Sequence, residues 1–354
     1  MVYLNTATAP PAPLPVRAAV DRALDQWASG QFDWQGWERD ADDTRALFAR
    51  LIDARPENVA LMGSVAEAAA TVARSLRPPG RIVVGAREFR SNLAPWLALA
   101  DRGFAVVEVQ PDKRGVVTTE SLVAAIDGRT TLVAVTEVQS VNGYRVRVPD
   151  IAAAAHAVGA RFFLSAMQSL GVLRMSVRES DPDFVVTHGY KWLLAPRGAA
   201  WLYVRTDRIA ELEPLAPSWK SVPDPLEDYY GRAPLAEGAR KLDLSLAWFS
   251  WVGAKAALEL LLAVPRGEVE TRAVGLAHEF RVAADGLGLE LAPMEVPSQI
   301  VAVHVPDAES LRERLARERI IAAVRGGYLR VGFHGFNDPA DVAAALGALQ
   351  RARA

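Results

Sequence analysis

The 354-residue chain contains no cysteine. This absence excludes disulfide bridges, thiolate nucleophiles and cysteine-ligated metal sites. The five histidines are dispersed along the chain. No HExxH, GxSxG, GxGxxG or Walker phosphate-loop pattern occurs either, and each of these carries a specific chemistry in other proteins. We therefore expect no metal site, and the chemistry of this chain must depend on other residue types.

A strong net charge and long apolar runs are also missing. The formal net charge is -2 at pH 7, which argues against a nucleic-acid footprint or a polybasic membrane patch. No run of about 18 uninterrupted apolar residues occurs, so we expect no transmembrane helix. The first residues lack the basic and then apolar pattern of a signal peptide. We expect a cytoplasmic protein without nucleic-acid or membrane partners.

Lysine is scarce, because arginine supplies most of the 40 basic residues. Of the few lysines, Lys191 stands out, since it lies between the apolar run 184–186 and the aromatic-apolar run 192–194. One interpretation is a lysine at a strand end that extends its amine towards solvent. The other is a lysine in an apolar pocket, where the amine loses its proton and forms a Schiff base.

Short apolar runs alternate with helical patterns along most of the chain. The runs 59–62, 81–84, 104–110, 131–136, 161–164, 184–187 and 199–204 predict strands, and 64–76, 91–100, 118–126 and 150–158 predict helices. This alternation favours an α/β fold with a mostly parallel sheet.

The C-terminal part has a different pattern. Two long helices are expected over 248–264 and 267–286, followed by a strand 300–305, a helix 308–318, strands 320–324 and 328–333, and a helix 338–352. We place a large domain at 16–260 and a small α+β domain at 261–354, with residues 1–15 as an arm that joins the small domain.

Polar and aromatic residues follow several predicted strands at their C-terminal ends, where ligands collect in open α/β sheets. Ser64 opens a helix directly after a strand, which exposes free N–H groups to an anion; the alternative is a plain capping box with Glu67. The other residues in this position are Phe89, Ser165, Gln168 and Lys191.

This order of motifs resembles the class V aminotransferase family of fold-type-I pyridoxal-phosphate (PLP) enzymes, the group that includes cysteine desulfurases and isopenicillin-N-epimerase-like proteins. The similar segments are YLNTATAP, GSVAEAAA, EFRSNLAPW, SAMQSLG, THGYKWLLAPRGAAWLYV and LRVGFHGFNDPADV, and they span nearly the whole chain. The resemblance implies PLP as the cofactor, a large domain whose mostly parallel sheet is flanked by helices, and a homodimer with shared active sites.

The resemblance also implies a role for each matching residue. Lys191 would form the Schiff base with PLP and Phe89 would stack on its ring. Gln168 would hydrogen-bond the phenolic oxygen, with Ser140 beside it, and Ser165 would face the ring nitrogen. Ser64, the N–H of Val65, His188 and Tyr190 would surround the phosphate, together with Ser245 of the partner subunit. Arg330 would bind the substrate carboxylate, with Asn5 from the YLNTATAP segment nearby.

Several residues depart from the family pattern. Ser165 replaces the carboxylate that keeps the ring nitrogen protonated and makes PLP a strong electron sink. Ser140 stands where relatives have asparagine, and His188 and Tyr190 stand where they have serine and histidine. The segment KLDLSLAWF lacks the Gly-Thr pair expected from a partner subunit. Without a cysteine, the chain also cannot hold sulfur as a persulfide on its own side chain.

These departures favour some reactions over others. A hydroxyl at the ring nitrogen weakens the electron sink, so full transamination should suffer more than elimination at the β-carbon, where a leaving group takes the charge away. We expect a PLP enzyme that acts on an amino acid, tilted towards lyase or epimerase-like chemistry. The alternatives are an amino-acid aminotransferase and a degenerate member that binds without PLP chemistry. A further alternative is an unusual PLP reaction in a large pocket shaped by Trp34, Trp37, Trp219, Tyr229 and Tyr230.

Overall fold

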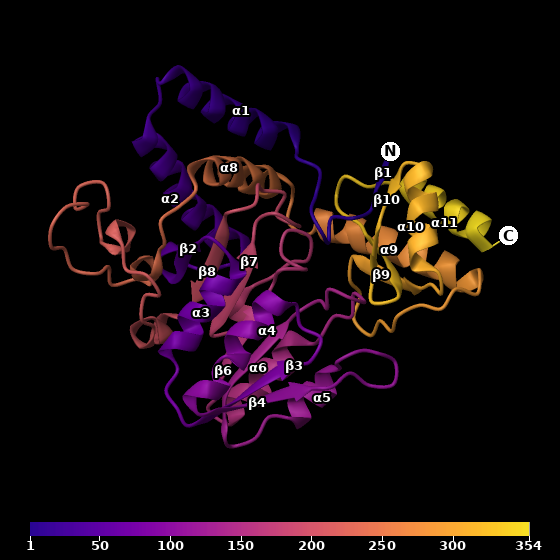
Figure 1. Cartoon of the computed structure of the whole chain (residues 1–354), viewed down its shortest axis with the longest axis horizontal. Helices are drawn as coiled ribbons and strands as arrows, with labels where there is room; N and C mark the ends of the chain where they lie inside the picture. Colours follow the sequence, from indigo (N-terminus) through magenta and orange to yellow (C-terminus); the bar gives the residue numbers. More distant parts are fainter. Residues whose placement is uncertain (354) are drawn as a thin grey trace.

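The computed structural model describes residues 1–353 and has a seven-stranded sheet at its centre, in the order β2-β8-β7-β6-β5-β3-β4 (Figure 1). Every neighbouring pair is parallel except the two that involve β8, which is antiparallel to both neighbours. The prediction of a mostly parallel sheet is confirmed. The strands are β2 (Val59–Met62), β3 (Gly80–Gly85), β4 (Phe104–Val109), β5 (Thr130–Thr136), β6 (Arg161–Ser165), β7 (Phe184–His188) and β8 (Ala200–Val204).

Helices cover both faces of this sheet. Successive residues of β5 point to opposite faces, so Val133 belongs to the apolar core under α2, α6 and α8, whereas Leu132 belongs to the core under α3 and α4. Burial on both faces explains why the strands read as continuous apolar runs. The helices of this part are α1 (Leu14–Ser29), α2 (Trp34–Leu51), α3 (Val65–Ser75), α4 (Arg90–Leu97), α5 (Thr119–Ala124), α6 (Val148–Ala157), α7 (Val177–Ser180) and α8 (Trp248–Ala263).

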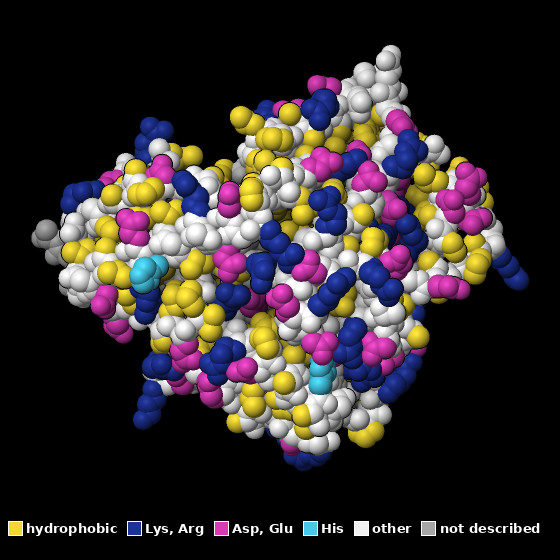
Figure 2. Space-filling view, turned by 180° about the vertical axis from the view of Figure 1, so that it is seen from behind, with side chains coloured by type: hydrophobic (Ala, Val, Ile, Leu, Met, Phe, Trp, Pro, Cys, Tyr) yellow, Lys and Arg dark blue, Asp and Glu magenta, His cyan; other side chains and the backbone are white. Residues whose placement is uncertain are grey.

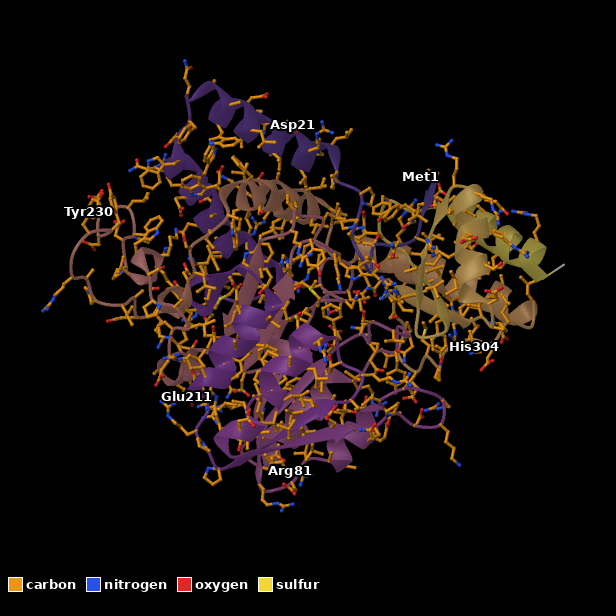
Figure 3. The ribbon with its side chains drawn as sticks, viewed as in Figure 1. Met1, Asp21, Arg81, Glu211, Tyr230 and His304 are labelled. Carbon is orange, nitrogen blue, oxygen red and sulfur yellow. The ribbon has the colours of Figure 1, made fainter. Side chains whose placement is uncertain are left out.

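The C-terminal part packs around a separate apolar cluster, to which Leu4 of the N-terminal arm and Val138 and Trp192 of the large part also contribute. A three-stranded antiparallel sheet has the order β11-β12-β9, formed by β9 (Ile300–His304), β11 (Ala323–Arg325) and β12 (Tyr328–Gly332). Helices α9 (Glu268–Gly286), α10 (Ala308–Arg317) and α11 (Pro339–Arg353) accompany it. The N-terminal strand β1 (Val2–Tyr3) joins this part by pairing in parallel with β10 (Ile320–Ile321), and Figure 3 shows Met1 beside it.

The expectation of a single strand over 320–324 is wrong. The segment divides into β10 and β11, which belong to different sheets. Ile320 and Ile321 pair with the N-terminal arm, whereas Ala323 pairs with Arg330 in a hairpin. A continuous apolar run does not reveal that its two halves have different partners, because the N-terminal partner is more than 300 residues away in the sequence.

In the described part of the chain, no single helix is long and apolar enough to span a membrane. Helices α8 and α9 are long and apolar enough only when taken together, and they are bent by 83° relative to each other.

The segment after β8 forms a long loop that projects from the body, with Tyr230 near its tip (Figure 3). On the face shown in Figure 2, basic and acidic side chains are interspersed, as the small net charge of the sequence suggests.

Candidate active site

A cavity of about 460 Å³ lies at the C-terminal ends of the parallel strands. It collects side chains that are widely separated in the sequence, because parallel strands end at the same edge of a sheet. The residues of the predicted site that line it are Ser64, Val65, Phe89, Ser140, Ser165, Gln168, His188, Tyr190 and Lys191. Arg330 lies behind this lining and contacts it through Ser140.

Lys191 follows β7 by three residues and is only 5% exposed. Its Nζ lies 5.4 Å from the centre of the Phe89 ring and 5.8 Å from that of Tyr190. Burial, together with the positive charges of Arg330 and Arg325, lowers the pKa of Lys191 to about 7. No carboxylate forms an ion pair with it among the described residues. The amine can therefore lose its proton near neutral pH. Its burial excludes the interpretation that Lys191 extends its amine into solvent.

One end of the cavity is built to receive an anion. Ser64 caps α3, and its Oγ accepts a hydrogen bond from the N–H of Glu67 at 3.2 Å. The N–H groups of Val65 and Ala66, in the first turn, have no acceptor within the helix and are available to a ligand. The Glu67 carboxylate accepts from the Ser64 hydroxyl at 3.0 Å and not from its backbone N–H, so the expected reciprocal capping box is incomplete.

His188 contributes an unused polar atom to the same end. The residue is buried, and its Nδ1 has no hydrogen-bond partner among the described residues. Burial, followed by the charges of Arg197 and Lys191, lowers the pKa of His188 to about 4, so the ring is neutral at neutral pH. Its ring packs edge-on against Tyr190, with ring centres 4.5 Å apart. A neutral imidazole that carries its proton on an unpartnered nitrogen can serve a phosphate as a hydrogen-bond donor.

Gln168 and Ser140 form a hydrogen-bonded wall between the cavity and Arg330. Gln168 Nε2 donates to Ala7 O at 3.1 Å and to Ser140 Oγ at 3.0 Å, while its Oε1 accepts from Trp192. Arg330 Nη1 also donates to Ser140 Oγ, at 3.2 Å. Since both N–H groups of Gln168 are engaged and Ser140 Oγ accepts twice, the Ser140 hydroxyl hydrogen is the group left to point into the cavity.

The guanidinium of Arg330 is itself partly engaged. Its Nη2 donates to Thr8 Oγ1 at 3.0 Å, and its buried Nε has no partner among the described residues. Burial, with the nearby charge of Arg325, lowers the pKa of Arg330 to about 10, so it remains a cation at neutral pH. A buried cation that has no anionic partner reduces the stability of the folded protein. The carboxylate of a bound substrate would be such a partner for Arg330.

Ser165 ends β6 and is 2% exposed. Its register partner on β5 is Thr136, and the two lie side by side at the bottom of the cavity. Glu88 and Asn92 from the segment after β3 also line this part, and their side chains hydrogen-bond Thr136. The sequence patterns did not assign a role to these neighbours. Glu88 could have been noticed as an acid directly before an aromatic residue at a strand end.

Besides Arg330, two predicted residues, Asn5 and Ser245, lie outside the cavity lining. Asn5 forms a backbone bridge with Gly332 in the small part, and its buried Oδ1 has no partner among the described residues. Ser245 is exposed on the surface of its own chain.

The aromatic residues proposed to shape a large pocket pack together elsewhere. The ring of Trp34 lies 6.4 Å from that of Trp219 and 6.3 Å from that of Tyr229. None of the five aromatics, Trp34, Trp37, Trp219, Tyr229 and Tyr230, belongs to the described lining around Lys191.

The cavity fits pyridoxal 5′-phosphate. The buried amine of Lys191 suits the aldehyde, and the ring of Phe89, 55% exposed, offers a flat face beside it. The unpartnered His188 Nδ1 and the N-terminus of α3 suit the phosphate.

Comparisons with known proteins agree with this fit. The family model described as aminotransferase class-V matches residues 2–328. A probable cysteine desulfurase of Methanothermobacter thermautotrophicus is 33% identical over 260 residues, which cover 72% of this chain and 65% of that protein, just under two thirds of its length. Isopenicillin N epimerase of Streptomyces clavuligerus is 30% identical over 304 residues, which cover 79% of this chain and 75% of that enzyme.

The comparison with solved structures shows the same fold in another protein. The structure of a cystine C–S lyase, C-DES, in complex with its product cysteine persulfide superposes with a TM-score of 0.88. The match covers 98% of this chain and 97% of the other at 18% sequence identity, so it shows the fold alone.

Proposed function

The chain belongs to the class-V aminotransferase family of PLP-dependent enzymes, and we propose that it is a lyase that cleaves a bond at the β-carbon of a small amino acid. The observation that carries the proposal is the buried amine of Lys191, which faces Phe89 in a cavity whose floor has a serine at residue 165. When bound, PLP withdraws electrons from the substrate α-carbon and so acidifies its C–H bond.

Lys191 would move the proton of this bond. With a pKa of about 7, a substantial fraction of the amine is neutral near neutral pH and can accept a proton. The protonated amine can return that proton to carbon or transfer it to the departing group. Its position beside Phe89 confines these transfers to one side of the ring site.

Arg330 and Ser140 would bind and orient the substrate. The guanidinium presents N–H groups from behind Ser140, and a carboxylate that reached it would replace the weak contacts to Ser140 Oγ and Thr8 Oγ1. Ser140, free to donate its hydroxyl hydrogen, would bind the phenolic oxygen. The prediction that Gln168 itself binds this oxygen stays a prediction; its hydrogen bonds show that it holds Ser140 in place.

Ser165 supports cleavage over transamination. A neutral hydroxyl does not balance a positive charge on the ring nitrogen as a carboxylate does. Elimination depends less on that charge, because the leaving group departs from the β-carbon with the bonding electron pair. The 33% identity to a probable cysteine desulfurase supports a sulfur leaving group.

Epimerisation at the α-carbon is the second candidate. Isopenicillin N epimerase, at 30% identity, favours it. Both reactions begin with removal of the α-proton, but only cleavage releases a leaving group and a 2-oxo acid.

The test begins with cofactor attachment. The purified protein, supplied with PLP, should be yellow, and borohydride reduction followed by peptide mass mapping should fix the cofactor on Lys191. A protein that stays colourless with excess PLP would refute the proposal and favour the degenerate alternative.

The reaction is then assigned by product analysis in deuterium oxide with cysteine, cystine and other small amino acids. Sulfide or persulfide together with pyruvate would support a C–S lyase. Inversion with solvent deuterium at the α-carbon and no cleavage would support the epimerase. Conversion of 2-oxoglutarate to glutamate at ordinary enzyme rates would refute both and support an aminotransferase.

The subunit arrangement is also part of the proposal. A homodimer with shared active sites would use Ser245, which is exposed on its own chain and outside its own cavity. Sedimentation analysis would measure the assembly, and a monomer that retains full activity would refute the shared site.

A further inference from the structure

Glu88 places a carboxylate at the floor of the cavity, where the mechanism above gives it no role. It follows the C-terminal end of β3 and lines the cavity with Thr136 and Ser165. Its Oε1 accepts the backbone N–H of Thr136 at 2.6 Å, and its Oε2 accepts the Thr136 hydroxyl and the side-chain N–H of Asn92, the latter at 3.1 Å. These three bonds fix the carboxylate beside the end of β5.

This carboxylate has no cation to balance it. Among the described residues, no arginine, lysine or histidine forms an ion pair with Glu88. Burial raises the pKa of Glu88, although its hydrogen bonds to Thr136 and Asn92 act in the opposite direction. A positive charge placed near it would therefore be stabilised, and would in turn stabilise the anionic form of Glu88.

The geometry shows where such a charge would lie. The strands run in the order β6-β5-β3, and their ends place Ser165, Thr136 and Glu88 in a row. Thr136 and Ser165 are register partners in parallel strands, so their side chains point to the same face of the sheet. Thr136 therefore bonds Glu88 through its hydroxyl and is the strand neighbour of Ser165, the residue that would face the ring nitrogen.

We propose that Glu88, acting through Thr136 and Ser165, supplies the negative charge that keeps the ring nitrogen of PLP protonated. The inference rests on the proposed function, since it requires PLP bound with its nitrogen at Ser165. Glu88 is a positioning residue, because it acts through two hydroxyl groups and does not touch the ring. Thr136 Oγ1 already donates to Glu88 and accepts from Asn92, so it has one lone pair left to accept from the Ser165 hydroxyl, and that bond would complete the chain. Hydrogen bonds in such a completed chain would polarise one another in a site of low dielectric constant.

The consequence concerns the electron sink. A serine alone leaves the nitrogen with a neutral partner, so its proton would be lost at lower pH. With the charge of Glu88 separated from it by the two hydroxyl groups of Thr136 and Ser165, the nitrogen keeps part of the support that a direct carboxylate gives. The enzyme would then hold an electron sink of intermediate strength.

The experiment measures the nitrogen directly. The holoenzyme is prepared with PLP labelled with ¹⁵N at the ring, and the nitrogen chemical shift is followed against pH in the wild type and in E88Q, T136V and S165D. We expect a protonated nitrogen at pH 7 in the wild type. Its pKa should fall by at least about one unit in E88Q, a tenfold change in protonation, and in the same direction in T136V.

Controls separate charge from folding. E67Q removes the other carboxylate of the described lining, which bonds Ser64 at the start of α3 and not Thr136, and should leave the pKa of the nitrogen unchanged. The double variant E88Q/S165D should regain a protonated nitrogen. T136V removes a single hydroxyl, so it tests the chain of hydrogen bonds even if E88Q folds poorly.

Two failures are distinguishable. If borohydride fixes PLP on Lys191 but the nitrogen is unprotonated in the wild type, or is unaffected by both E88Q and T136V, the role of Glu88 is refuted while the proposed function stands. If PLP does not attach in the wild type, the proposed function is refuted and this inference with it.

Discussion

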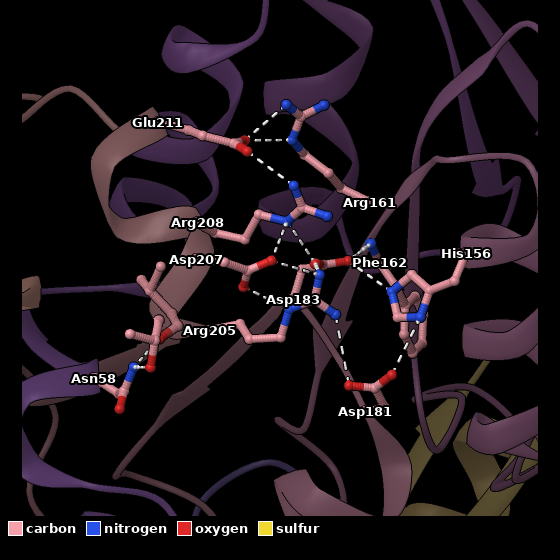
Figure 4. Close-up of polar contacts among 12 residues, drawn as sticks. Asn58, His156, Arg161, Phe162, Asp181, Asp183, Arg205, Asp207, Arg208 and Glu211 are labelled. Atoms are coloured by element: carbon pink, nitrogen blue, oxygen red, sulfur yellow. Dashed lines mark hydrogen bonds and ion pairs between the residues drawn. The ribbon is translucent and has the colours of Figure 1, made fainter.

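The two edges of the central sheet treat buried polar groups in opposite ways. At the N-terminal edge, the fully buried carboxylate of Asp183 accepts hydrogen bonds from the Phe162 N–H at 2.7 Å and from Arg208 Nε at 2.8 Å (Figure 4). It also contacts Arg205 at 2.6 Å and His156 at 2.9 Å. Every oxygen of this carboxylate has a partner, and the cluster joins β6, β7, β8 and α6.

At the C-terminal edge, the buried groups are left incomplete. Lys191 has no carboxylate partner in the described part of the chain, and Glu88 has no cation. His188 Nδ1 and Arg330 Nε have no hydrogen-bond partner there either. Buried polar groups without partners cost stability, and proteins keep few of them.

One sheet can therefore provide stability at one edge and a ligand site at the other. The satisfied cluster around Asp183 stabilises the order of the strands and does not need a ligand. Of the unsatisfied groups around Lys191, His188 and Glu88 are positioned by strands of the central sheet and Arg330 by β12 of the small sheet. They would gain their partners from a cofactor and a substrate. We therefore expect substitutions at the C-terminal edge to reduce activity and substitutions at the N-terminal edge to reduce stability.

The largest expected effect on activity follows from Lys191→Ala. Loss of the proton-transferring amine alone should reduce kcat by about 10²–10⁴-fold, and covalent attachment of PLP should disappear. The melting temperature of the cofactor-free protein should not fall, because a buried cation without a partner is removed. Lys255→Ala, which removes a surface lysine paired with Asp40 and Asp43, is the control and should retain activity. Full activity in the Lys191 variant would contradict the assignment.

The largest expected effect on stability follows from Asp183→Ala. Two arginines would lose their buried partner, and the free energy of unfolding should fall by about 3–5 kcal/mol in urea denaturation. The protein that remains folded should keep its kcat. Asp207→Ala removes an exposed carboxylate that contacts the same two arginines and should cost only about 0–1 kcal/mol. Equal losses in both variants would show that burial at Asp183 is not the cause.

A smaller effect is expected from Arg330→Lys. An ammonium keeps the charge but not the paired N–H geometry that a carboxylate prefers, so KM should rise roughly 10-fold to 100-fold. Steady-state kinetics should show a smaller change in kcat. The exposed Arg325 offers a matched control, and Arg325→Lys should leave KM nearly unchanged. An unaltered KM in Arg330→Lys would mean that the substrate carboxylate binds elsewhere.

The smallest effect concerns pH. Lys191 has a pKa of about 7 in the folded protein and 10.5 in the unfolded chain, so the unfolded chain binds more protons between these values. The free energy of unfolding of the cofactor-free protein should therefore rise with pH from about 7 towards 10, by at most about 1.4 kcal/mol per pH unit. Urea denaturation at several pH values would measure the slope, which should diminish in Lys191→Met. An equal slope in both proteins would show that Lys191 is not the source.

Much of the fold could be predicted because the pattern is local. The apolar run at β7 and the polar break after it indicated a buried strand, and β7 is found at Phe184–His188. Ser64 indicated the start of α3, and it caps that helix. The division of 320–324 between two sheets could not be predicted, since both partners are distant in the sequence and apolar residues suit either one.

The residues and motifs of single segments were enough to predict Lys191 as the central group. Lys191 was marked by its apolar neighbours and by the scarcity of lysine, and the order of motifs indicated PLP. These features are properties of single segments, so they can be recognised without the fold.

Which groups contact one another depends on the packing of distant segments and could not be predicted from the sequence. Gln168 has the donors to bind a cofactor, but the structure directs both of them to Ala7 and Ser140. Glu88 is an ordinary acid in the sequence, and it becomes a candidate only because β3, β5 and β6 end side by side. The physical reason is that a hydrogen bond or a charge acts over a few ångströms of space, and the distances between segments are fixed by how the strands pair and the helices pack on them.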